Sequence, residues 1–256
     1  MSDRQEREKR KAARLQEETQ VQSQDRRARI LQLGAGAVFL VLAVVVVLIV
    51  VNASSNGNSG DTKLEEVGGV DRLLSGIPQE GLVLGDPKAK VELIEFGDLQ
   101  CPFCKAFSED ILPQVIETKI ATGEAKLVFR NFPIIGEEST PAGVAAIAGG
   151  AQGRGWNYIE LFYRNQGEER SGYVTDEFMT AIAEGAGVKD IAKWNTERKA
   201  PKATEEVEKT GEEASGKFGF EGTPSFAIKG PGTNGIETLS LNEDPGYYEQ
   251  AIEEAS

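Results

Sequence analysis

The sequence predicts an α/β domain preceded by a single transmembrane helix, and three observations support this fold class. First, residues 30–51 form an apolar stretch that is long enough to cross a bilayer as a helix. Second, apolar runs at 91–96 and 125–130 flank a segment with helical spacing, which predicts a strand–helix–strand unit. Third, the second half of the chain contains helical patterns followed by two short apolar runs, so strands and helices share one domain.

The segments next to the apolar stretch predict how the chain lies in a membrane. Residues 1–29 hold nine Lys or Arg and six Asp or Glu with few large apolar groups, so we expect a disordered charged tail. Arg26, Arg27 and Arg29 precede the apolar stretch. No Lys or Arg follows it before Lys63. The positive-inside rule therefore places the tail in the cytoplasm and the rest outside, as in a single-pass protein of the cell membrane.

The transmembrane interpretation of residues 30–51 has two alternatives. A buried core helix is disfavoured because no polar face interrupts this long stretch. A cleaved signal peptide would end near Val51-Asn52-Ala53, but the apolar region of a signal peptide usually spans only about 7–15 residues. We therefore predict an uncleaved anchor, followed by a flexible extracytoplasmic linker at 52–75 with one short helix near Leu64–Leu74.

The folded domain is predicted to cover residues 76–256. The two cysteines follow the strand at 91–96 and begin a helix, in which Pro113 should produce a kink. The strand at 125–130 should run parallel to the first strand, because a helix connects the two. The other expected elements are helices within 139–165, 175–186, 188–198, 202–217 and 246–254, and a hairpin of strands from 225–230 and 236–241.

The composition excludes several kinds of site. The chain has no histidine, which removes Ser-His-Asp and Cys-His catalysis as well as His-ligated zinc and haem. It has two cysteines, too few for a four-cysteine metal site, so we expect neither a metal nor a bound cofactor. The net charge is −13, and the acidic groups concentrate after the apolar stretch, which disfavours binding of nucleic acid.

The two cysteines, Cys101 and Cys104, form a Cys-Pro-Phe-Cys motif at the start of a helix. Unpaired backbone N–H groups and the helix dipole favour a thiolate at this position, which makes the outer thiol a good nucleophile and leaving group. We therefore assign Cys101 the attacking role and Cys104 the resolving role. A metal site would lack ligands, and a disulfide across so short a loop would add little stability, so we favour a redox-active pair.

Four further residues are candidates for tuning the cysteine pair or binding substrate. Pro102 suits a first helical position, where its missing N–H is not needed. Phe103 offers neither charge nor hydrogen bond, so the pKa of the Cys101 thiol should be lowered less than it would be beside a histidine. Thr223 and Pro224 precede a short apolar run; residue preferences alone favour a trans bond between them, with a cis bond as the alternative.

Glu95 lies within the otherwise apolar strand that leads to the cysteines. On a buried face its pKa would rise, which would make it a possible proton acceptor for Cys104; the alternative is a solvent-facing strand residue. Glu92 and Glu95 cannot both lie on one face of a strand, so we expect at least one to point inward. Asp98, in the loop that follows, is expected to be an ordinary solvated residue.

On these residues, the chain resembles the DsbA-like branch of the thioredoxin superfamily, most closely the single-pass membrane-anchored members of Gram-positive actinobacteria. The matching segments are spread over residues 76–226 and are far more specific than a lone Cys-x-x-Cys. They are GIPQEGLVLGDPKAKVELIEFGDLQCPFCKAF (76–107), LVFRNFP (127–133), NQGEERSGYVTDEF (165–178) and KFGFEGTPSF (217–226).

The resemblance implies a thioredoxin fold with a helical domain inserted at about 137–200. It also implies that Cys101 is the nucleophile and Cys104 the resolving thiol. Pro224 matches the family's cis-proline, which binds extended substrate chain, and Thr223 matches the residue that tunes the reduction potential. Glu95 falls where the family places its buried acid.

The resemblance further implies an extracytoplasmic enzyme that donates the disulfide between its two cysteines to unfolded or newly exported Cys-containing proteins. A quinone-linked membrane partner would reoxidise it. Phe103 replaces the histidine of the strongest oxidants in the family, so a membrane-tethered reductase or isomerase is the first alternative. A non-catalytic peptide-binding module is the second, although the intact cysteines disfavour it. Two methionines and no histidine disfavour a copper-thiolate chaperone, and glutaredoxins, which share Cys-Pro-Phe-Cys, lack an anchor and a helical insertion.

Overall fold

The computed structural model describes residues 63–256. The predicted charged tail, the predicted transmembrane helix at 30–51 and the first part of the predicted linker therefore lie outside the described residues. Within residues 63–256, no helix is both long enough and apolar enough to span a bilayer.

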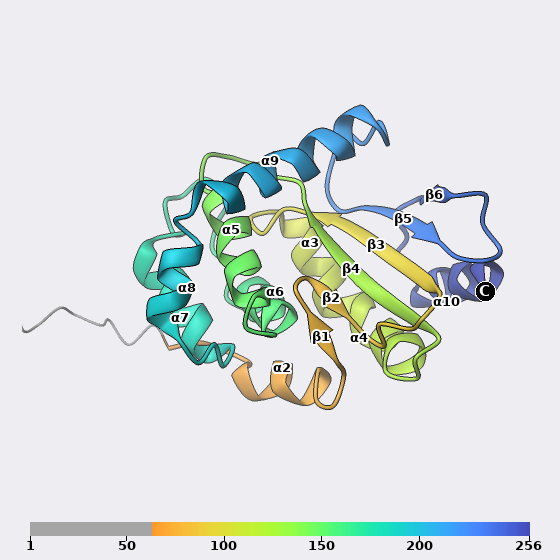
Figure 1. The fold of residues 1–256 in the computed structure, drawn as a ribbon, viewed down its shortest axis with the longest axis horizontal. Helices are drawn as coiled ribbons and strands as arrows, with labels where there is room; N and C mark the ends of the chain where they lie inside the picture. Colours follow the sequence, from red (N-terminus) through yellow and green to blue (C-terminus); the bar gives the residue numbers. More distant parts are fainter. Residues whose placement is uncertain (1–62) are drawn as a thin grey trace, which may run out of the picture. The chain divides into compact units, whose positions relative to one another are not determined.

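A six-stranded sheet in the order β1-β2-β4-β3-β5-β6 forms the centre of the described domain (Figure 1). Its two central strands, β3 and β4, run parallel in a register that pairs Val91 with Ala125 and Gly97 with Asn131, which confirms the predicted strand–helix–strand unit. The predicted hairpin of β5 and β6 is also present and antiparallel. The strands are β1 (Gln79–Glu80), β2 (Val83–Leu84), β3 (Val91–Gly97), β4 (Ala125–Asn131), β5 (Ser225–Lys229) and β6 (Ile236–Leu239).

Helices cover both faces of the sheet (Figure 1). The segment between β3 and β4 consists of α3 (Pro102–Ala106), the π-helical turn η1 (Phe107–Ile111), α4 (Leu112–Val115) and the π-helical turn η2 (Ile116–Ile120). The remaining helices are α2 (Val67–Leu73), α5 (Ser139–Gly150), α6 (Gly155–Arg164), α7 (Asp176–Gly185), α8 (Ile191–Glu197), α9 (Pro201–Gly216) and α10 (Pro245–Ala255). Helices α5 to α8 lie between β4 and α9 in the sequence, where the resemblance implied a helical insertion.

Strand β3 is buried on both faces, and its side chains point alternately into two hydrophobic core clusters on opposite faces of the sheet. Leu93 lies in the main core with the α3–η2 segment and α10, whereas Ile94 and Phe96 pack in a second cluster that includes Ala214 of α9. Because side chains alternate along a strand, Glu95 shares the face of Leu93. The sheet therefore places this carboxylate on the same side as the helix that the cysteines begin.

Three elements differ from the sequence prediction. The short hairpin of β1 and β2 was missed, because each strand has only two residues and no alternation can be detected over that length. The helical stretch at 139–165 is two helices, separated by a turn in which Gly153 has a φ of +69°. Around Pro113, where the sequence predicted a kink, π-helical turns lie on either side of α4, and the N–H of Leu112 donates to the carbonyl of Phe107.

The folded domain also begins earlier than the predicted boundary at residue 76. Helix α2 contacts α6, and Val70 and Leu74 are buried in the main core. The short helix expected within the linker is thus present, but it packs onto the domain because its two apolar side chains are removed from water there.

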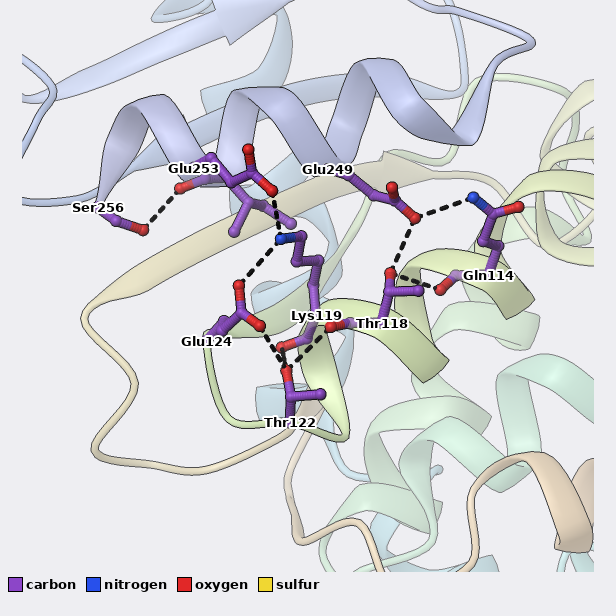
Figure 2. Close-up of polar contacts among 9 residues, drawn as sticks. Gln114, Thr118, Lys119, Thr122, Glu124, Glu249, Glu253 and Ser256 are labelled. Atoms are coloured by element: carbon purple, nitrogen blue, oxygen red, sulfur yellow. Dashed lines mark hydrogen bonds and ion pairs between the residues drawn. The ribbon is translucent and has the colours of Figure 1, made fainter.

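The C-terminal helix α10 is fastened to the α4–η2 segment by a polar network on its outer side (Figure 2). The ammonium of Lys119 lies 2.6 Å from a Glu253 oxygen and 3.0 Å from a Glu124 oxygen. Glu249 accepts hydrogen bonds from the Gln114 amide at 3.0 Å and the Thr118 hydroxyl at 2.9 Å. Lys119 is therefore the centre of this attachment, and its stem is largely covered by the helices that it joins.

Replacing Lys119 by alanine should lower the free energy of unfolding by about 1 kcal/mol, because two ion pairs and the packing of the stem are lost together. Urea unfolding followed by circular dichroism measures the change. Lys90→Ala is the matched control, since Lys90 is exposed and makes no ion pair within the described residues. An equal effect of both substitutions would show that the attachment adds no stability.

Candidate functional site

The two cysteines lie at the end of β3, where the chain turns into α3. Cys101 is the residue before the helix, with extended backbone angles, and its N–H donates to the Asp98 carbonyl at 2.9 Å. Pro102 occupies the first turn of the helix, as its missing N–H allows. Both thiols are free and buried, whereas Phe103 between them is 69% exposed. The motif therefore presents an apolar side chain to solvent and keeps its sulfurs largely covered.

The surroundings of Cys101 favour its thiolate. They lower the pKa of the thiol from 9.0 to about 6, and the largest cause is a hydrogen bond from the Cys104 thiol. Burial opposes this effect, and further hydrogen bonds from Thr223 and from the backbone N–H groups of Cys104 and Phe103 support it. This shift arises without a histidine in the motif, because neighbouring S–H, O–H and N–H donors converge on the sulfur.

Thr223 contacts Cys101 through two groups. The Cys101 thiol donates to the Thr223 carbonyl oxygen, with 3.2 Å between sulfur and oxygen. The buried Thr223 hydroxyl has no hydrogen-bond partner within the described residues. It is thus free to donate to the sulfur once Cys101 loses its proton. The following Thr223–Pro224 bond is cis, as the resemblance implied and residue preferences alone did not.

The surroundings of Cys104 have the opposite effect. Its side chain is fully buried, and burial is the largest cause that raises the pKa of its thiol well above the ordinary value. The hydrogen bond to Cys101 and the negative charges of Cys101 and Glu95 raise it further, while a hydrogen bond from the Asp98 backbone N–H acts against them. At neutral pH the site therefore holds one thiolate and one thiol, with the charge on the outer sulfur.

Glu95 lies on the face of the sheet that carries the cysteine pair and is 1% exposed. One of its carboxylate oxygens, Oε1, has no hydrogen-bond partner within the described residues. Burial raises its pKa well above the ordinary value, and the charges of Glu160 and Cys101 add to this. Glu92, on the other face, is half-buried and pairs with Lys126 at 3.2 Å, so Glu95 is the one of the two that points inward.

The prediction for Asp98 was wrong, because this residue is 2% exposed and anchors the loop before the cysteines. One oxygen accepts from the N–H groups of Ile134 and Ile135 at 2.8 and 2.9 Å. The other accepts from the N–H of Gln100 at 2.9 Å. Asp98 thus ties the cysteine loop to the segment that leads into the helical insertion, which no periodic pattern in the sequence signals.

The helical insertion fastens the same loop from the other side. The Gln166 amide donates to the carbonyls of Leu99 and Cys101 at 2.8 and 3.1 Å. The Gln100 amide donates to the Ser139 hydroxyl at 3.0 Å. Neither Gln166 nor Gln100 could be selected from the sequence, since lone glutamines in loops have no pattern that predicts burial. Within residues 63–256, no group of three or more carboxylate or thiol side chains is placed to hold a metal ion.

Comparisons with known proteins agree with this geometry. A family model described as thioredoxin matches residues 78–240. Probable disulfide bond formation proteins D of Bacillus anthracis and Bacillus cereus are 30% and 29% identical to the chain over 150 residues, which is 57% of this chain and 69% of each relative. Oxidised BdbD from Bacillus subtilis covers 70% of this chain and 97% of its own, at 22% identity and a TM-score of 0.60. The structure of α-DsbA1 from Wolbachia pipientis covers 68% of this chain and 89% of its own, at 22% identity and a TM-score of 0.58. Both likenesses concern the fold.

The reduced chain should show a thiolate absorbance at 240 nm that titrates with a midpoint near pH 6, the value about which the Cys101 thiol loses its proton. Cys104→Ala should raise this midpoint, because it removes the largest cause of the lowered pKa. Cys101→Ser is the control and should abolish the transition.

The stability of the reduced fold should depend on pH for the same reason. Because the folded-state pKa of Cys101 lies below 9.0, its thiolate stabilises the reduced fold fully above pH 9 and ceases to do so as the pH falls through about 6.

Replacing Asp98 by alanine should destabilise the domain by about 3 kcal/mol or more, because three backbone N–H groups lose their acceptor. Asp98→Asn should cost less, since one oxygen remains. Asp110→Ala, at an exposed position of η1, controls for the loss of charge. Urea unfolding measures all three, and an Asp98→Ala domain as stable as the control would contradict the anchoring role.

Proposed function

Because the chain belongs to the thioredoxin family and is a DsbA-like protein-disulfide oxidoreductase, we propose that it donates the Cys101–Cys104 disulfide to exported proteins that contain cysteines. The observation that carries this proposal is the unequal state of the two thiols. A lowered pKa makes Cys101 a good leaving group, and a raised pKa makes Cys104 retain its proton.

The reaction follows from this inequality in two steps. A client thiolate attacks the sulfur of Cys101, the disulfide to Cys104 breaks, and Cys104 leaves with the electron pair. Its raised pKa means that it takes up a proton, and we assign the supply of this proton to buried Glu95, whose own raised pKa and charge effect on Cys104 support the role. A second client thiolate then attacks the client sulfur of the mixed disulfide. Cys101 leaves as the thiolate, so the client is oxidised and the enzyme is reduced by two electrons.

The exposed surface around the pair suits an unfolded client. Phe103 is 69% exposed and Ile134, on the segment held by Asp98, is 40% exposed, so apolar side chains border the redox motif. Thr223 and Pro224 enter β5 beside Cys101, where an extended client chain would bind as the resemblance implies. We assign Phe103, Thr223 and Pro224 to client binding and tuning on these grounds.

We further propose an extracytoplasmic location. Residues 30–51 would anchor the chain in the cell membrane with residues 1–29 in the cytoplasm, because basic residues precede the apolar stretch. Clients would then be unfolded or newly exported proteins in an oxidising compartment. The reduced enzyme would be reoxidised by a quinone-linked membrane partner, which the family resemblance supports.

The reduction potential of the full-length chain, equilibrated against glutathione, tests the direction of electron flow. A value between about −120 and −180 mV is expected for an enzyme that donates disulfides. A value near −270 mV would resemble thioredoxin and would replace the donor role by that of a reductase.

A turnover assay completes the test. The oxidised chain should promote disulfide formation in a reduced, unfolded protein, and Cys101→Ser should abolish this activity. Offered a client that already contains a disulfide, Cys104→Ser should accumulate a mixed disulfide, because its Cys101 thiolate breaks the client disulfide, releases one client thiolate and has no second enzyme thiol to resolve the product. Client binding that survives in Cys101→Ser without any turnover in the wild type would point to a peptide-binding module instead.

A further inference from the structure

Helix α6 of the helical insertion buries a second carboxylate behind the redox pair. Glu160 is fully buried. Its Oε1 accepts a hydrogen bond from the Ser108 hydroxyl of η1 at 2.9 Å. Its Oε2 lies 3.2 Å from the guanidinium of Arg164, one turn further along α6, but makes no hydrogen bond within the described residues. A buried carboxylate with one incompletely satisfied oxygen is costly, and a neutral side chain of similar size would avoid that cost.

The charged groups around Glu160 come from four elements, which are α6, η1, α3 and β3. Arg164 is the cation on its own helix and is 12% exposed at its side chain. From η1, Glu109 adds a negative charge, which Lys105 partly offsets through an ion pair at 3.0 Å. From β3, Glu95 interacts with Glu160 through its charge. Burial is the largest cause that raises the pKa of Glu160, to about 7, so its charge changes within the neutral range.

The two buried carboxylates are linked to the cysteines in one direction and to the surface in the other. Glu160 is the charged group with the largest effect on the pKa of Glu95, second only to burial. Glu95 in turn raises the pKa of the Cys104 thiol. On the outer side, Arg164 reaches partial exposure next to Glu160. Ser108, whose hydroxyl binds Glu160, lies four residues after Cys104 in the same helical segment, so Glu160 contacts the turn that follows the inner cysteine.

We propose that Glu160 is a positioning residue of the redox site, which keeps on Glu95 the proton that Cys104 takes up when the disulfide opens. This inference rests on the proposed thiol–disulfide exchange and deepens it. When the client thiolate breaks the disulfide, the proton passes from the Glu95 carboxyl to the Cys104 sulfur, which leaves Glu95 ionised. A residue of the helical insertion, Glu160, thus increases the proton affinity of Glu95, which lies in the thioredoxin part of the domain.

The test is the rate at which dithiothreitol reduces the oxidised full-length chain, measured from pH 5 to 9 for the wild type and Glu160→Gln. In the oxidised chain neither cysteine carries a charge, so burial and Glu160 remain as the causes that hold the proton on Glu95. The ratio of variant to wild-type rate removes the titration of dithiothreitol, which is common to both. The rate should fall at alkaline pH once Glu95 has lost its proton. In Glu160→Gln this fall should occur at a pH lower by about half a unit or more, because Glu95 loses its proton more easily.

Two further variants separate this role from a structural one. In a Glu95→Gln background, Glu160→Gln should leave the pH profile unchanged, because the group through which it acts is gone. Glu117→Gln, an exposed carboxylate on η2, removes the same charge and should leave the wild-type profile unchanged. Should Glu160→Gln fail to fold, Ser108→Ala weakens the ionised form of Glu160 by removing its hydrogen bond and should shift the profile in the same direction.

An unshifted profile in Glu160→Gln, or an equal shift with and without Glu95, would overturn the inference while leaving the proposed function intact. If Glu160→Gln does not fold, an unshifted profile in Ser108→Ala would overturn it in the same way. A wild-type chain that dithiothreitol cannot reduce and glutathione disulfide cannot reoxidise would overturn the proposed function, and this inference with it.

Discussion

Cys101 holds a negative charge near neutral pH because Cys104, one helical turn further on, keeps its proton and donates it as a hydrogen bond. This interaction requires the two sulfurs to have different surroundings. The outer sulfur receives hydrogen bonds from Thr223 and from the backbone, whereas the inner sulfur is removed from water and faces the charge of Glu95. The alternation of β3 provides this difference, since it places Glu95 on the face beneath the helix that the cysteines begin.

The same interaction depends on a loop that both halves of the domain hold in place. Asp98 ties the residues before the cysteines to the chain after β4, and Gln166 ties them to the end of α6. The Asp98 backbone N–H also donates to the Cys104 sulfur. The helical insertion is therefore more than a cover for the thioredoxin part, because it fixes the loop whose backbone contacts the inner thiol.

The sequence predicted the elements that a periodic pattern or a motif defines. The parallel pair β3–β4, the hairpin β5–β6 and the final helix follow from apolar runs of sufficient length. The period of two along β3 predicted that at least one of Glu92 and Glu95 points inward, and the buried one is Glu95, which the family resemblance favoured. The two-residue strands β1 and β2 carry no such pattern. Asp98 and Glu160 were not predicted as buried, because a charged residue in a loop or a helix is usually solvated and only tertiary contacts show otherwise.

The free energy by which the Cys101 thiolate stabilises the reduced state limits how far one residue of the motif can change the reduction potential. With its pKa lowered from 9.0 to about 6, the Cys101 thiolate stabilises the reduced state at pH 7 by about 1 kcal/mol or less once solvent screening is allowed for. For a two-electron couple this corresponds to about 20 mV, whereas about 90 mV separate thioredoxin from the disulfide isomerases. The side chain at Phe103 can change only the contribution of the thiolate, which is the smaller of these two differences in potential. A larger difference in potential has to come from interactions of the buried groups, Cys104 and Glu95, that differ between the dithiol and the disulfide. When the disulfide opens, Cys104 gains a proton and Glu95 gives one up.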